Sequence, residues 1–175
     1  LSIGCSPAQI SFAAPLTFNG FVNEGTLVYN DLFTIYPYEN QLFVLKMKGK
    51  EIKDYLEHSY DMWINTIDSA DDRLLKIVNE PDPRTGQKRW SFVGRSYNFD
   101  SAAGLHYVVD VTRPAGERVK IMSLADGSPF SMDAEYNVAM TSYRASGGGG
   151  LMRHGAGIDT DKIDDRVVEY YPEIR

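Results

Sequence analysis

A run of strand-forming residues is followed directly by a segment whose apolar residues recur at helical spacing, and this pair of segments is the best guide to the fold. Leu42 to Met47 is rich in β-formers and ends at Lys48 and Gly49, which predicts a strand that stops at a turn. Lys50 to Asn65 predicts a helix, because its apolar residues recur at spacings of three and four: Ile52, Tyr55, Leu56, Tyr60, Trp63 and Ile64. Charged residues, Glu57 among them, fall largely on the opposite face, so this helix is expected to cover one side of a sheet.

Three further runs predict strands. Leu105 to Val111 and Arg118 to Leu124 alternate apolar and polar residues, and Arg113 to Gly116 forms a turn between them. Tyr136 to Tyr143 is the last predicted strand.

The remaining segments are less regular. We interpret Leu1 to Phe21 as a loop with short extended pieces, and Asn30 begins a short helical turn that Pro37 ends. A short helix is predicted over Asp72 to Val78, and the tail from Thr160 is expected to be partly helical. Because helices and strands are mixed without a βαβ rhythm, the predicted fold class is α+β, with a mixed, largely antiparallel sheet and packed helices.

Size and charge limit the possible functions. A chain of 175 residues suits a single domain over residues 1–175. The net charge of −6 argues against binding a nucleic-acid polymer, which requires a basic surface, but still allows a small anionic ligand. No apolar run approaches the roughly 20 residues of a membrane span. The chain starts at Leu1, with no Met and no signal pattern, and is interpreted as part of something longer.

The residue types that perform catalysis do not form a known motif. One cysteine, Cys5, can form neither a disulfide framework nor a cysteine-based zinc site. His58 and His106 are interpreted as surface residues, whereas His154 follows a glycine run and could reach a ligand from there. None of the three lies in a metal-binding frame. We therefore expect no catalytic residue and no metal site in this chain.

The segment from Tyr36 to Asn40 carries the first binding signal. Pro37 stiffens the chain, so that Tyr38 lies on a rigid bend just before a strand, with Asn40 two residues further on. A flat ring beside an amide is suited to recognising a nucleobase, by stacking on its face and hydrogen bonding to its edge. A purely structural role for this tyrosine is the alternative.

The segment from Tyr143 to Gly150 carries the second signal. Tyr143 and Arg144 lead into four glycines, and Gly147 and Gly148 would let the backbone approach a ligand closely. The lysine and hydroxyl residue of a phosphate loop do not follow, and a flexible linker or a turn is the alternative interpretation. A second aromatic on the opposite face of one ligand ring would complete a clamp with Tyr38.

The order of three blocks resembles the C-terminal domain of the bacterial 5'-nucleotidase and 2',3'-cyclic-nucleotide 2'-phosphodiesterase family. The resemblance covers roughly Ala8 to Gly157. Its blocks are Ala8 to Ser11 leading to Tyr36–Asn40, then Met47 to Leu56, and finally Tyr136 to Ala139 followed by Tyr143–Ala145 and the glycines.

The resemblance implies a role for the chain and for its residues. Hydrolysis would belong to an upstream metallophosphatase domain, absent from this chain, that holds two divalent metal ions. This domain would bind the nucleotide or nucleoside, with Tyr38 and Tyr143 stacking on the base and Asn40 at its edge. Arg144 is a candidate for a phosphate or sugar contact, with a surface ion pair as the alternative. The resemblance also implies a periplasmic or cell-surface location.

Two departures from the family pattern leave the substrate open. The 5'-nucleotidases carry a phosphate-binding arginine where Pro7 stands, and a ribose-binding aspartate where Gly149 stands. The tyrosine pair followed by Arg144 is more similar to the cyclic phosphodiesterase and 3'-nucleotidase branch. The alternative is a non-enzymatic binding or adhesion module that retains the fold.

Overall fold

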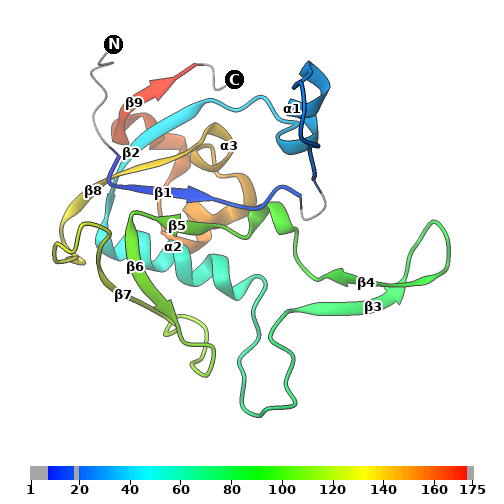
Figure 1. Cartoon of the computed structure of the whole chain (residues 1–175). Helices are drawn as coiled ribbons and strands as arrows, with labels where there is room; N and C mark the ends of the chain where they lie inside the picture. Colours follow the sequence, from blue (N-terminus) through cyan, green and yellow to red (C-terminus); the bar gives the residue numbers. More distant parts are fainter. Residues whose placement is uncertain (1–7, 18–19, 173–175) are drawn as a thin grey trace.

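The computed structural model describes residues 8–17 and 20–172 (Figure 1). In chain order its elements are β1 (Ile10–Ala13), α1 (Tyr29–Ile35), β2 (Leu42–Lys48), α2 (Gly49–Asp61), β3 (Ile77–Pro81), β4 (Lys88–Phe92), η1 (Ser96–Asn98), β5 (Ser101–Ala103), β6 (Leu105–Val109), β7 (Val119–Leu124), β8 (Glu135–Thr141), α3 (Ser142–Ala145), η2 (Gly148–Gly150), the π-helix η3 (Leu151–Gly155), η4 (Thr160–Arg166) and β9 (Val167–Tyr171).

A five-stranded sheet in the order β5-β1-β8-β2-β9 forms the centre of the fold. Only the β1–β8 pair in this sheet is parallel, and the other three pairs are antiparallel. The predicted α+β class with a mixed, largely antiparallel sheet is therefore confirmed. Two separate hairpins, β3–β4 and β6–β7, complete the described strands, and the β3–β4 hairpin projects away from the sheet in Figure 1.

Helix α2 supplies one side of the core, as its apolar stripe predicts. Ile52, Tyr55 and Leu56 are fully buried and belong to one cluster with the inward side chains of β1, β2 and β8. Glu57 is an exception to the polar face, because it is buried and accepts hydrogen bonds from the backbone N–H groups of Gly116, Arg118 and Val119. None of the helices in the described ranges has the length and apolar character needed to span a membrane.

Several predicted boundaries are wrong. The helix predicted to reach Asn65 ends at Asp61, because Ile64 leaves the helical path and forms a β-bridge with Leu75. No helix forms over 72–78, where the chain turns and enters β3. The tail is helical only over η4 and then adds the edge strand β9 beside β2.

One end of the sheet gathers chain segments that are far apart in the sequence. The pairs Ala13↔Ser101 and Leu42↔Thr141 lie at this end, where β1 and β8 finish and β2 and β5 begin. The loops that enter and leave these four strands therefore meet at the same edge. Every segment that lines the site described next adjoins this edge.

Candidate functional site

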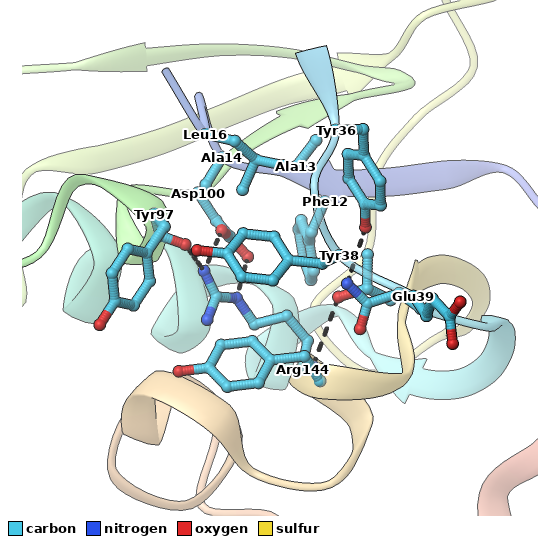
Figure 2. A pocket seen from close by; sticks show the side chains of 13 residues that line it. Phe12, Ala13, Ala14, Leu16, Tyr36, Tyr38, Glu39, Tyr97, Asp100 and Arg144 are labelled. Carbon is cyan, nitrogen blue, oxygen red and sulfur yellow. Dashed lines mark hydrogen bonds and ion pairs between the residues drawn. The ribbon is translucent and has the colours of Figure 1, made fainter. Parts of the chain in front are cut away.

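A cavity of about 380 Å³ lies at this end of the sheet. Ligand pockets in proteins begin at about 300 Å³, so the cavity has room for a small planar ligand. Figure 2 shows the ring of Tyr38 in the middle of the view, with Tyr36 and Tyr97 at its two sides and Asp100 and Arg144 behind and below it. The cavity is lined by Phe12, Ala13, Ala14, Leu16, Tyr36, Tyr38, Glu39, Asn40, Tyr97, Asp100, Thr141, Tyr143 and Arg144.

The chain around Pro37 delivers Tyr38 to the cavity. Proline disfavours the helical conformation for the residue before it, and Tyr36 accordingly has φ −141° and ψ 89° as α1 ends. Tyr38 follows with 53% of its surface exposed, and the ring of Tyr36 meets it edge-on with centroids 6.5 Å apart. The ring of Tyr38 is thus held from the side rather than packed into the core.

Asn40 is oriented by its neighbours. Its Nδ2 donates to the hydroxyl oxygen of Tyr36 at 2.8 Å, and its Oδ1 accepts from the hydroxyl of Ser142 at 3.3 Å. A carboxamide has two N–H donors and an oxygen with two lone pairs. These bonds fix the plane of the amide while leaving donor and acceptor capacity for the edge of a ligand.

Tyr143 reaches the same cavity from β8. The predicted strand end is wrong here, because β8 stops at Thr141 and Tyr143 lies in the one-turn helix α3. Thr141 caps this turn, since its side chain accepts a hydrogen bond from the backbone N–H of Arg144. Tyr143 is 43% exposed. The two tyrosines chosen from sequence therefore line one cavity, and neither is buried in the core.

The glycine run forms a packed turn beneath Tyr143. Gly147 has φ +97°, a conformation that glycine adopts readily. A Cβ on Gly148 would lie 2.5 Å from ring carbons of Tyr143, and one on Gly149 would lie 2.5 Å from Asn98 Oδ1. The run is therefore a turn, as one of the two alternatives held, and not a flexible linker. An aspartate in place of Gly149 would not fit this arrangement.

Arg144 does not form the surface ion pair considered above. Its side chain is 4% exposed and pairs with Asp100, which is 1% exposed. Sequence reasoning missed Asp100 because its partner lies in a distant segment and no motif surrounds it. A carboxylate directly after Phe99 and directly before a short strand was the only available signal.

The other candidates lie elsewhere. His106 is exposed on β6, as predicted, while His58 and His154 lie with ring centroids 6.4 Å apart, and none of the three lines the cavity. Burial, and then the nearby His154, lower the pKa of His58. Within residues 8–17 and 20–172, no three His, Cys, Asp or Glu side chains cluster as a metal site. Cys5 and Pro7 lie outside the described residues.

Comparison with known proteins adds the relationships of the chain. Over 164 residues it is 32% identical to the trifunctional nucleotide phosphoesterase protein YfkN of Bacillus subtilis, a match that covers 83% of this chain and 10% of that protein. It is 31% identical to the 2',3'-cyclic-nucleotide 2'-phosphodiesterase/3'-nucleotidase of Salmonella typhimurium, over 79% of this chain and 23% of the relative. The chain thus spans between a tenth and a quarter of the length of these relatives.

The fold and the sequence profile agree. A putative 5'-nucleotidase from Staphylococcus aureus superposes with a TM-score of 0.67 at 22% identity, covering 95% of this chain and 28% of that one. This likeness shows a shared fold. The profile of the family described as 5'-nucleotidase, C-terminal domain, matches residues 5–154. The chain therefore belongs to the 5'-nucleotidase C-terminal domain family.

Proposed function

We propose that this chain is the nucleotide-recognition domain of a longer phosphohydrolase. In this proposal the base stacks between Tyr38 and Tyr143 and Asn40 contacts its edge, whereas Gly147 and Gly148, which do not line the cavity, form the turn beneath Tyr143. One observation carries the proposal: two half-exposed tyrosines from distant segments line a single cavity large enough for a nucleoside. Stacking on an aromatic side chain stabilises a bound base by about 1–3 kcal/mol.

The reaction itself is assigned to another part of the protein. The donor set required for two divalent ions is not found among the described residues, so we place those ions in a metallophosphatase domain upstream. This chain alone is expected to be inactive. The similarity to the Salmonella enzyme favours a 2',3'-cyclic or 3'-phosphorylated nucleotide as the substrate. A periplasmic or cell-surface location is proposed from the family resemblance alone.

Calorimetric titration of adenosine into the chain tests the proposal. We expect Tyr38→Ala and Tyr143→Ala each to weaken binding by about 1–3 kcal/mol, or roughly 5- to 150-fold, because each removes one stacking face. Tyr170→Ala is the matched control, since Tyr170 is also exposed but stacks on Phe43, away from the cavity. Undiminished binding by the Tyr38→Ala, Tyr143→Ala double variant would contradict the proposal. It would favour the alternative of a module that has kept only the fold.

A further inference from the structure

The guanidinium of Arg144 has every donor occupied inside the protein. Its Nε and Nη2 donate to the two carboxylate oxygens of Asp100 at 2.8 and 2.6 Å, an arrangement that is geometrically specific as well as strong. Its Nη1 donates to Asn98 Oδ1 at 2.9 Å and to the carbonyl of Gly148 at 3.0 Å. The second N–H of Nη2 donates to the carbonyl of Tyr97, with 2.6 Å between the nitrogen and the oxygen. A guanidinium has five N–H donors, and all five are used.

Asp100 is held as firmly as its partner. The hydroxyl of Tyr55 donates to one of its carboxylate oxygens, and the hydroxyl of Ser59 donates to its backbone carbonyl at 2.6 Å. Tyr55 is itself fixed, because its ring stacks on Phe12 with centroids 4.1 Å apart and planes 7° apart. The ion pair is thus tied to helix α2 and to strand β1 and has little freedom to open.

The ring of Tyr143 and the glycine turn beneath it form what we call the Tyr143 platform, and the same guanidinium contacts both. Its Cζ lies over the Tyr143 ring, 5.2 Å from the centroid, which is within the range of a cation–π contact. Its bond to the Gly148 carbonyl anchors the turn on which that ring rests. Arg144 therefore holds the ring and the glycine turn in one fixed relation.

The charges around the cavity have a consequence for the ligand. The charged side chains that line it are Glu39, Asp100 and Arg144, and Arg144 is neutralised by Asp100. Among the described lining residues no cation is left with free donors for a phosphate. Charge-assisted hydrogen bonds from such a group are the strongest contacts that a side chain makes to a phosphate. The cavity is better suited to the uncharged base and sugar.

We propose that Arg144, locked by Asp100, is a positioning residue that orients Tyr143, and that the cavity is a nucleoside subsite which does not bind the phosphate. This proposal rests on the proposed function. It replaces the expectation that Arg144 contacts the phosphate or sugar directly. The phosphate then points out of the cavity, away from the described residues that line it.

Titration of adenosine, adenosine 3'-monophosphate and inorganic phosphate, at about 50 and about 500 mM salt, measures the contribution of the phosphate. We expect the nucleoside and nucleotide affinities to agree within about twofold at both salt concentrations, and inorganic phosphate not to bind, because no cation with free donors is found among the described residues that line the cavity. A nucleotide that binds about tenfold more tightly at low salt, and loses this advantage at high salt, would overturn the inference.

Substitution by lysine separates a positioning role from a charge role. Arg144→Lys keeps the charge but cannot make the two-pronged pair with Asp100. We expect it to weaken adenosine and adenosine 3'-monophosphate equally, by about tenfold, and to shift the NMR resonances of a ¹³C-labelled Tyr143 ring, since the platform loses its support. Arg118→Lys, at a buried arginine outside the cavity, is the control and should change neither quantity.

A milder variant covers the case in which Arg144→Lys does not fold. Tyr55→Phe keeps the ring stack but removes the hydroxyl that donates to Asp100, and should shift the Tyr143 resonances while weakening both ligands by about threefold. Variants at Arg144 or Tyr55 that behave like Arg118→Lys would overturn the positioning role while leaving the proposed function intact. Adenosine binding that does not depend on Tyr38 and Tyr143 would instead remove the proposed function, and the inference with it.

Discussion

Two arginines are buried in the part of the chain that the structure describes, and they are held in different ways. The guanidinium of Arg118 donates to the carbonyls of Arg113 and Ile64 and to the hydroxyl of Thr66. It also donates to Asp61 at 3.4 Å, and the side chain of Asp61 is 44% exposed. Arg144 instead forms a two-pronged pair with Asp100, whose side chain is buried completely. Arg118 joins loops mainly through neutral acceptors, with one longer contact to a partly exposed carboxylate. Arg144 instead places a fixed ion pair directly beneath an exposed aromatic ring. This contrast distinguishes a structural cation from one that shapes a site.

The two acidic partners should therefore differ in their effect on stability. Asp100→Ala leaves a buried guanidinium without its counter-charge, which should lower the free energy of unfolding by about 3–5 kcal/mol. Asp61→Ala removes a partly exposed partner, and its effect should stay below about 1 kcal/mol. Urea unfolding of both variants beside the wild type measures the difference. Equal losses would show that the two arginines are held in the same way.

The glycines near the two arginines should also differ in how a substitution affects stability and adenosine affinity. Gly148→Ala places a methyl group against the Tyr143 ring and should cost about 1–3 kcal/mol of stability by overpacking, together with about tenfold in adenosine affinity. Gly116→Ala, two residues before Arg118, meets open space but has φ +91° and should cost about 1–2 kcal/mol through backbone strain alone. Thermal unfolding and calorimetry on each variant separate the two effects.

A loss of adenosine affinity in Gly116→Ala, or unchanged affinity in Gly148→Ala, would contradict this expectation. The former would mean that general destabilisation is enough to weaken binding. The latter would mean that the platform beneath Tyr143 does not determine the position of its ring.

Apolar periodicity and the position of a proline predicted two of the helices, because these elements depend on residues that are close together in the sequence. The period of Ile52, Tyr55 and Leu56 identified α2 and its buried face, and Pro37 identified the end of α1. The predicted helix ran too far because Trp63 and Ile64 continue the apolar spacing, although Ile64 pairs with Leu75 instead. Such pairing is nonlocal, so the period of the sequence carries no trace of it.

The candidate site also has a part that the sequence indicates and a part that it does not. Tyr38 and Tyr143 were recognisable because each lies beside a proline or a glycine run, and the cavity does bring them together. The Asp100–Arg144 pair was not recognisable, because a buried ion pair depends on the tertiary arrangement that removes both groups from water. Strand β9 was missed because it pairs only with the distant β2, at the edge of the sheet.

The position of a bound base between the two rings is the central claim, and intermolecular nuclear Overhauser effects measure it directly. With adenosine bound to the wild-type chain, the base protons should show contacts to the ring protons of both Tyr38 and Tyr143 and none to those of Tyr170, which lies outside the cavity. Contacts to only one of the two cavity tyrosines, or to Tyr170, would contradict the claim.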